Sequence, residues 1–171
     1  PRHPPLHPRR TYKDRIQELL PSVHENFRLA DLVRGSADDF EVMYGLRDAE
    51  EIYRLHIAPY CPLFLCTCGA EGVVLCTPEG SSRFPVPPVH TVSTIGAGDN
   101  FNAGFIYGLI RYGIRRIDLP GLSCTQWYQA VDCGIRFAAD VCGSIHNSID
   151  EEFGKQMAKK LQASSGQDVQ K

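Results

Sequence analysis

The chain has 171 residues, a length typical of one domain, with 43% hydrophobic and 22% charged residues, as in an ordinary globular protein. Its formal net charge of −2 excludes a strong electrostatic attraction to nucleic acid or to an anionic membrane surface. No run reaches the roughly 18 apolar residues of a transmembrane helix, and the first ten residues lack the apolar region of a secretory signal. We therefore expect a cytoplasmic protein with no membrane or nucleic-acid partner.

The seven cysteines are odd in number, and most lie inside apolar segments. Because disulfides are rare in reducing compartments, we expect buried free thiols. A metal site at Cys61, Cys66 and Cys68 is the minor alternative, since their spacing matches no common zinc pattern. Alternation along a strand would place Cys66 and Cys68 in one buried row.

The N-terminal segment predicts a loop, a helix and a short strand. Residues 1–10 hold four prolines and three arginines without periodicity, which is typical of an extended segment. Apolar residues recur at helical spacing over residues 12–29, where Pro21 should kink or split the helix. Residues 32–33 then predict a short buried strand ending at Arg34-Gly35.

Two short helices follow. Ser36 precedes Asp39 by three residues, which resembles a capping box at a helix N-terminus. Gly45 should end that helix, because glycine readily takes the left-handed conformation found after helices. Residues 48–58 predict the second helix.

A pair of strands is expected in the middle of the chain. Residues 62–68 are a compact apolar run, residues 69–72 a glycine turn, and residues 73–76 a second apolar run that ends at residues 78–80. Residues 84–89 are proline-rich, so a strand there would lie at a sheet edge.

The rest of the chain predicts three helices. The first starts near Asp99, carries Phe101, Phe105, Leu109 and Tyr112 on one face, and stops at Gly113. The others span residues 125–141 and 150–161, and could pack on one another beside the sheet. Strands mixed with helices in this order indicate a layered α/β fold.

The most informative stretch is the glycine loop before the first of these helices. Gly96 and Gly98, separated by Ala97, let the backbone turn tightly and approach a ligand. The N–H groups of Ala97, Gly98 and Asp99 could then converge on a phosphate at the helix N-terminus. The Asp99 carboxylate could accept a proton from an attacking hydroxyl. The short pattern alone leaves open a plain turn with Asp99 as N-cap, which is the commoner arrangement.

Residues 93–101 (STIGAGDNF) resemble the second signature of ribokinase-like (PfkB-type) carbohydrate kinases, D-T-x-G-A-G-D-x-F, with only its first position changed. Residues 67–72 resemble the T-x-G-x-x-G turn of that family, and residues 30–40 resemble the segment that carries its N-x-x-E motif. The resemblance covers roughly residues 12–160. It implies the C-terminal part of a three-layer α/β/α sandwich over residues 1–162, with residues 163–171 as a disordered tail.

The resemblance also implies ATP-dependent phosphorylation of a sugar hydroxyl. Asp99 would be the catalytic base, with Gly96, Ala97 and Gly98 as the anion hole. The residues expected at the ATP site are Thr67, Gly69, Gly72 and Asn147. Mg²⁺ would bridge the ATP phosphates mainly through phosphates and waters, with Asp39 as a candidate contact through a water.

The chain departs from the family pattern at three points. Ser93 replaces an acid that often helps to hold a monovalent cation, so potassium activation is not expected. Ser36 and Asp39 replace Asn and Glu, and helix capping explains both equally well. The N-terminal half of the family, with most sugar contacts and the lid strands used by many dimers, is absent, which would leave an unpaired sheet edge. A truncated or degenerate nucleotide-binding module without turnover is therefore the alternative to an active kinase.

Overall fold

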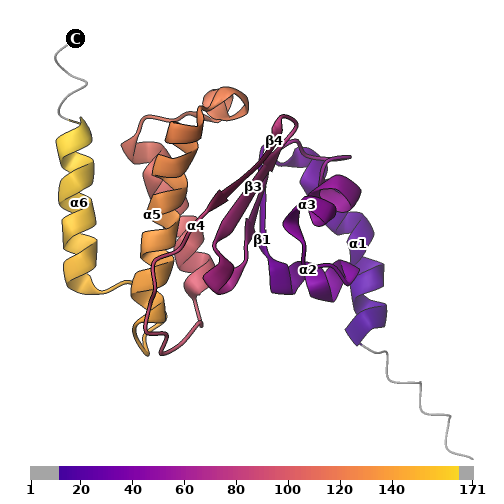
Figure 1. Cartoon of the computed structure of the whole chain (residues 1–171), viewed down its shortest axis with the longest axis horizontal. Coiled ribbons are helices and arrows are strands. Elements are labelled where there is room, and N and C mark those ends of the chain that lie inside the picture. Colours follow the sequence, from indigo (N-terminus) through magenta and orange to yellow (C-terminus); the bar gives the residue numbers. More distant parts are fainter. Residues whose placement is uncertain (1–11, 166–171) are drawn as a thin grey trace, which may run out of the picture.

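The computed structural model describes residues 12–165, and Figure 1 shows a sheet between two groups of helices. The predicted loop at residues 1–10 lies outside the described residues. The four strands are β1 (Val33–Ser36), β2 (Phe64–Thr67), β3 (Val73–Thr77) and β4 (Gly80–Phe84). The helices are α1 (Tyr12–Leu29), α2 (Ala37–Tyr44), α3 (Ala49–Ile52), α4 (Ala97–Arg111), α5 (Cys124–Cys142) and α6 (Glu151–Ser165).

The sheet has the strand order β1-β2-β3-β4, with β1 parallel to β2 and the other neighbours antiparallel. The parallel pair is connected through α2 and α3, while a 3-10 turn (Gly69–Glu71) joins β2 directly to β3. In the described part of the chain, β1 has a strand neighbour on one side only. The expected unpaired sheet edge is therefore β1 in the described residues.

Each face of the sheet has its own hydrophobic core, because successive side chains of a strand point to opposite faces. Phe64, Cys66, Val74 and Cys76 pack with α2 and α3, whose members Phe40 and Ile52 are buried. Leu63, Leu65, Val73 and Leu75 pack with α4 and α5 on the other face, where Phe101 and Trp127 are buried. The predicted three-layer α/β/α arrangement is therefore confirmed (Figure 1).

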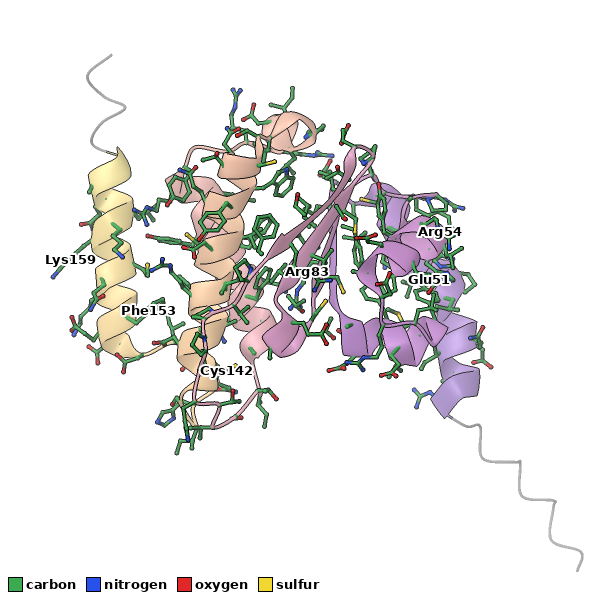
Figure 2. The ribbon with its side chains drawn as sticks, in the orientation of Figure 1. Glu51, Arg54, Arg83, Cys142, Phe153 and Lys159 are labelled. Carbon is green, nitrogen blue, oxygen red and sulfur yellow. The ribbon has the colours of Figure 1, made fainter. Side chains whose placement is uncertain are left out.

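The last helix packs on the outer side of α5. Phe153 of α6 points toward α5 in Figure 2, and its ring meets that of Phe137 edge-on at 5.2 Å between centroids. The Tyr107 hydroxyl of α4 donates to the Met157 carbonyl at 2.8 Å. The expected packing of the final helices on one another is thus observed.

Local signals in the sequence define several element boundaries well. Ser36 is the N-cap of α2 in a full capping box with Asp39, and Gly45 follows the helix in the left-handed conformation. Gly113 also has a positive φ of 63°, directly after α4 and its C-cap, as expected for a helix stop. In these places the contacts that decide the structure lie within four residues along the chain.

Three expectations need correction, and a fourth, the helix at residues 48–58, is confirmed with a different last turn. Pro21 lies inside one continuous helix and does not split it. The helix expected at residues 48–58 is α3 followed by a π-helical turn, Tyr53–Ile57. The edge strand is β4, which ends at Phe84 before the prolines, since a proline has no N–H for the ladder. The helix α6 reaches Ser165, so residues 163–165 of the expected tail are helical.

All seven cysteines are free, and four of them are buried. Cys66 and Cys68 lie on the same side of β2, as alternation predicts. Among the described residues, no group of three or more His, Cys, Asp or Glu side chains is placed to bind a metal ion. Across residues 12–165 no helix combines the length and apolar character needed to cross a membrane.

Candidate active site

The glycine loop is held in one conformation at the start of α4. Gly96 is the N-cap, with φ 81° and ψ −6°, and a Cβ there would approach the Asn147 carbonyl oxygen to 2.8 Å. The side-chain amide of Asn100 donates to the carbonyl oxygens of Gly96 at 2.9 Å and Asn147 at 3.0 Å. A side chain at position 96 would therefore strain the backbone and push this loop off the segment that follows α5.

Two of the three amides expected in the anion hole are open. The Ala97 N–H donates to the Thr94 carbonyl at 3.2 Å, whereas Gly98 and Asp99 have amides with no hydrogen-bond partner among the described residues. Such groups at a helix N-terminus carry the positive end of the helix dipole. They form a suitable binding site for an anion.

Asp99 is exposed in the first turn of α4. Its carboxylate makes no hydrogen bond or ion pair with any residue that the structure describes. The alternative role as an N-cap does not hold, because Gly96 occupies that position and α4 has no side-chain cap. The carboxylate is thus solvated and unengaged, beside the two open amides.

Arg34 joins this loop to the sheet, and sequence reasoning had not identified it. One guanidinium nitrogen donates to the Thr67 hydroxyl at 3.0 Å, and another lies 3.1 Å from where a Cβ on Gly98 would stand. The guanidinium also lies over the Phe101 ring at 5.2 Å. The signal in the sequence was an arginine inside a short apolar strand segment, where a charge needs a partner or a ligand.

The environment of Arg34 is electrostatically mixed. Burial lowers the pKa of its guanidinium, while the charges of Asp39, Cys66 and Asp99 act to raise it. An arginine stays protonated under these conditions. Its Nε atom is buried and has no hydrogen-bond partner among the described residues.

The remaining residues expected at the ATP site divide into two groups. Asn147 contacts the glycine loop directly through its backbone, whereas Thr67 ends β2 and is linked to the loop only through Arg34. Gly69 is exposed on the turn after β2. Gly72 is buried, and a Cβ there would come within 2.3 Å of the Phe84 carbonyl oxygen. Close approach of β4 therefore explains the glycine at position 72.

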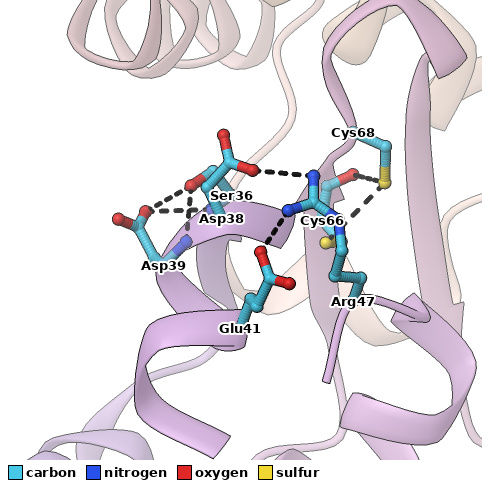
Figure 3. Close-up of polar contacts among 7 residues, drawn as sticks. All are labelled: Ser36, Asp38, Asp39, Glu41, Arg47, Cys66 and Cys68. Carbon is cyan, nitrogen blue, oxygen red and sulfur yellow. Dashed lines mark hydrogen bonds and ion pairs between the residues drawn. The ribbon is translucent and has the colours of Figure 1, made fainter. Parts of the chain in front are cut away.

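Asp39 is engaged in helix capping. Figure 3 shows its carboxylate beside Ser36, whose backbone N–H and hydroxyl donate to Oδ2 at 3.2 and 2.6 Å. The Asp39 amide donates back to the Ser36 hydroxyl at 3.0 Å. The other carboxylate oxygen remains available to a water. A divalent ion fits here only if phosphates and waters supply most of its ligands.

Two of the hollows among the described residues are lined by other segments. One, of about 540 Å³, is lined by residues of the α5–α6 connection, including Ser144, His146 and Ser148. Asn147 belongs to the same connection but does not line it. The other, of about 460 Å³, lies between α1 and α2. Neither includes Asp99.

Curated proteins with similar sequences are kinases of small molecules. The chain is 33% identical to the aminoimidazole riboside kinase of Salmonella typhimurium strain LT2 over 99 aligned residues. The aligned region covers 57% of this chain and 30% of that protein. The chain is 35% identical over 99 residues to a fructokinase of Klebsiella pneumoniae, covering 57% and 32%. The chain spans about a third of the length of these relatives.

Solved structures share the fold. The aminoimidazole riboside kinase from Salmonella enterica, solved with aminoimidazole riboside and an ATP analog, matches 85% of this chain and 46% of its own, with a TM-score of 0.65 and 22% identity. A fructokinase from Vibrio cholerae O395, solved with fructose, ADP and calcium ion, matches 85% and 45%, with a TM-score of 0.66 and 24% identity. This chain therefore spans under half of each structure.

A family model described as pfkB family carbohydrate kinase matches residues 9–144, which is most of the chain. The match includes β1, the turn after β2 and the loop that carries Asp99. The chain therefore belongs to the pfkB family of carbohydrate kinases.

Proposed function

We propose that this chain supplies the ATP-binding and catalytic part of an ATP-dependent sugar kinase. The observation that supports this most directly is the unengaged Asp99 carboxylate beside the open amides of Gly98 and Asp99. A positively charged side chain, Arg34, lies beside the same turn, with one guanidinium nitrogen 3.1 Å from the point where a Cβ on Gly98 would stand. Phosphoryl transfer depends mainly on positioning and on stabilising negative charge, and these groups can do both.

In the proposed reaction the sugar hydroxyl transfers its proton to the Asp99 carboxylate. The hydroxyl oxygen forms a bond to the γ-phosphorus, and the bond from that phosphorus to the bridging oxygen breaks, releasing ADP. The amides of Gly98 and Asp99 would face the transferring group within the Gly96–Gly98 anion hole. Ala97 could add its amide only by giving up its bond to Thr94.

The nucleotide would extend from this loop toward the end of β2. Thr67, Gly69 and Asn147 are the proposed contacts, with Gly72 shaping the turn. Mg²⁺ would neutralise phosphate charge, held by phosphates and waters with Asp39 as an outer contact. No potassium requirement is proposed. Ser93 offers a neutral hydroxyl and no carboxylate, and this hydroxyl already accepts a hydrogen bond from the Ile95 N–H at 3.2 Å.

A nucleotide-binding module without turnover is the second candidate. It is favoured by the exposed position of Asp99, and neither of the two hollows described above lies next to that carboxylate. In this case ATP would bind at the glycine loop, but the acceptor hydroxyl would lack the contacts that orient it. The two candidates share the binding site and differ only in turnover.

ADP release with a panel of sugars, measured beside ATP binding by thermal shift, separates the two. In an active kinase, Asp99→Asn should lower turnover by about 10²- to 10⁴-fold, the usual contribution of a general base, while ATP still raises the melting temperature. Asp38→Asn is the matched control, since Asp38 is also an exposed aspartate in the first turn of a helix.

Three outcomes contradict specific parts of the proposal. Asp99→Asn with near wild-type turnover would remove Asp99 as the base. ATP binding without ADP release in the parent chain would favour the module. Absence of any ATP-dependent stabilisation would reject both candidates.

A further inference from the structure

A second reactive feature lies beside the glycine turn. The sulfur atoms of Cys66 and Cys68 are 3.8 Å apart, and Figure 3 shows them facing each other. Cys66 belongs to β2 and is buried, whereas Cys68 follows the strand and is half-buried. Period-two alternation places both side chains on one side, and the backbone of Cys68, with φ −113° and ψ 34°, turns out of the strand.

The spacing permits a disulfide after a small movement. Two residues of an extended strand span about 6.6 Å, which falls at the upper end of the Cα separations of about 4.4–6.8 Å that disulfides tolerate. The sulfurs must approach by about 1.8 Å to reach a bond length of about 2.0 Å. Because the chain already bends at Cys68, that residue can supply the movement.

The two thiols differ in reactivity. The hydrogen bond with Cys66 lowers the pKa of the Cys68 thiol to about 7, and the charge of Arg83 acts in the same direction, against burial, Glu71 and Asp48. The hydrogen bond with Cys68 and burial raise the pKa of Cys66. Since the thiolate is the nucleophile, Cys68 reacts first and Cys66 second.

We propose that Cys66 and Cys68 form a peroxide-sensitive dithiol that oxidises to a disulfide and distorts the turn between β2 and β3. Cys68 loses its proton to solvent, and its thiolate attacks one oxygen of hydrogen peroxide. The O–O bond breaks, giving a sulfenic acid, and the hydroxide that leaves takes up a proton and becomes water. The Cys66 sulfur then attacks the Cys68 sulfur, the S–O bond breaks, and water leaves with the Cys66 proton. Two thiols and one peroxide thus yield one disulfide and two waters.

The distortion falls on the turn because Cys66 cannot move easily. It lies between two strand neighbours, Gly35 of β1 and Val74 of β3. The main chain of Cys68 is held by the turn alone. Its N–H donates a hydrogen bond to the Gly72 carbonyl at 2.8 Å, and its carbonyl accepts one from the Glu71 N–H at 3.1 Å. Closing the disulfide therefore shifts residues 68–72.

The functional consequence rests on the proposed function. Thr67 lies between the two cysteines and accepts a hydrogen bond from Arg34, and Gly69 follows directly. A displaced turn would misplace both residues relative to a nucleotide. We expect the oxidised chain to bind ATP about tenfold more weakly than the reduced chain, a loss that a titration resolves easily.

Peptide mapping by mass spectrometry after treatment with hydrogen peroxide tests the dithiol without any activity assay. The expected result is the loss of two hydrogens from the peptide that holds both cysteines, reversed by dithiothreitol. In Cys66→Ala, dimedone should trap a sulfenic acid at Cys68, because no resolving thiol remains. In Cys68→Ser, Cys66 should stay unmodified. Cys124→Ser, which removes an exposed thiol elsewhere, should oxidise at the dithiol like the wild type.

Failure of this inference is distinguishable from failure of the proposed function. Modification of Cys124 without a Cys66–Cys68 disulfide would overturn the dithiol. A disulfide that leaves ATP affinity unchanged would overturn its effect on the turn. A reduced chain that binds no ATP, yet forms the disulfide, would reject the proposed function and leave the dithiol in place.

Discussion

Arg34 connects three elements of the candidate site through one side chain. It starts on β1, donates to Thr67 at the end of β2 and lies behind Gly98 in the first turn of α4. The planar guanidinium can present several donors at once, which suits phosphate recognition. Its hydrogen bond to Thr67 and its position beside the first turn of α4 make Arg34 a candidate for a phosphate contact.

Replacing this side chain should weaken nucleotide binding. Hydrogen bonds to charged groups contribute about 1.5–3 kcal/mol, so Arg34→Gln should lower the affinity for ATP by about 10- to 100-fold. Isothermal titration with ATP and with inorganic tripolyphosphate measures the change and shows whether phosphate alone is recognised. Arg54→Gln is the control, because Arg54 is an exposed arginine in a loose ion pair with Glu51. Unchanged affinity in Arg34→Gln would exclude a phosphate contact.

At the scale of elements, the close packing of α4 on α5 sets the position of the glycine loop. A Cβ on Gly104 would lie 2.5 Å from the Cys133 carbonyl oxygen, and one on Gly108 would lie 2.9 Å from Ala130 Cα. These contacts involve backbone atoms, which cannot turn aside as a flexible side chain can. Glycines at the contact allow α4 to approach closely and direct its N-terminus toward Arg34.

Two Gly→Ala substitutions should have opposite effects on stability. Gly104→Ala should lower the free energy of unfolding by about 1–3 kcal/mol, since the methyl group overpacks the α4–α5 contact. Gly154→Ala in α6 should raise it by about 0.5–1 kcal/mol, because the new Cβ would meet only Ile149 Cδ1 at 3.6 Å and alanine favours a helix. Urea denaturation followed by circular dichroism measures both, and equal effects would contradict the packing argument.

The expectations that succeeded at this scale depended on local signals. The limits of α2, α4 and α5 follow from caps, glycine stops and apolar spacing, and the structure places them within a few residues of the prediction. β4 was missed, because its sequence GSSRF has little of the apolar alternation of a strand. That strand forms because its backbone pairs with β3, which no property of the segment itself indicates.

At the scale of the whole molecule, the two central strands are covered on both faces and paired on both sides. Residues of β2 and β3 such as Phe64, Leu65 and Val74 are buried, whereas most of β4 is exposed at the edge. Local opening costs more where apolar contacts and ladder hydrogen bonds are both broken. The centre of the sheet should therefore be the most stable part of the chain.

Amide hydrogen exchange measured by NMR or mass spectrometry checks this order. The amides of β2 and β3 should exchange slowest, at rates set by global unfolding, and the amides of β4 and α6 should exchange faster through local opening. Each strand serves as a control for the others within one sample. Exchange from β4 as slow as from β2 would show that another contact covers this edge.

The sequence alone determined the glycine loop, its aspartate and most helix ends. The positive φ at Gly96, the capping box at Ser36 and the apolar stripe of α4 act over three or four residues, so local physics is enough to predict them. It also indicated the layered fold, since the order of strands and helices restricts how apolar faces can be buried.

Only the tertiary structure decided which distant residues share the site. Arg34 donates a hydrogen bond to Thr67, which lies 33 residues away in the sequence. Asn100 donates one to the Asn147 carbonyl, 47 residues away. Such contacts form because helix and sheet layers pack in one way, and the packing energy depends on all the buried neighbours together. A pattern of a few residues does not contain that information, so the contact of Arg34 with Thr67 and the glycine loop could be found only in the structure. The pairing of Cys66 with Cys68 is different, because strand alternation alone had placed both on one side.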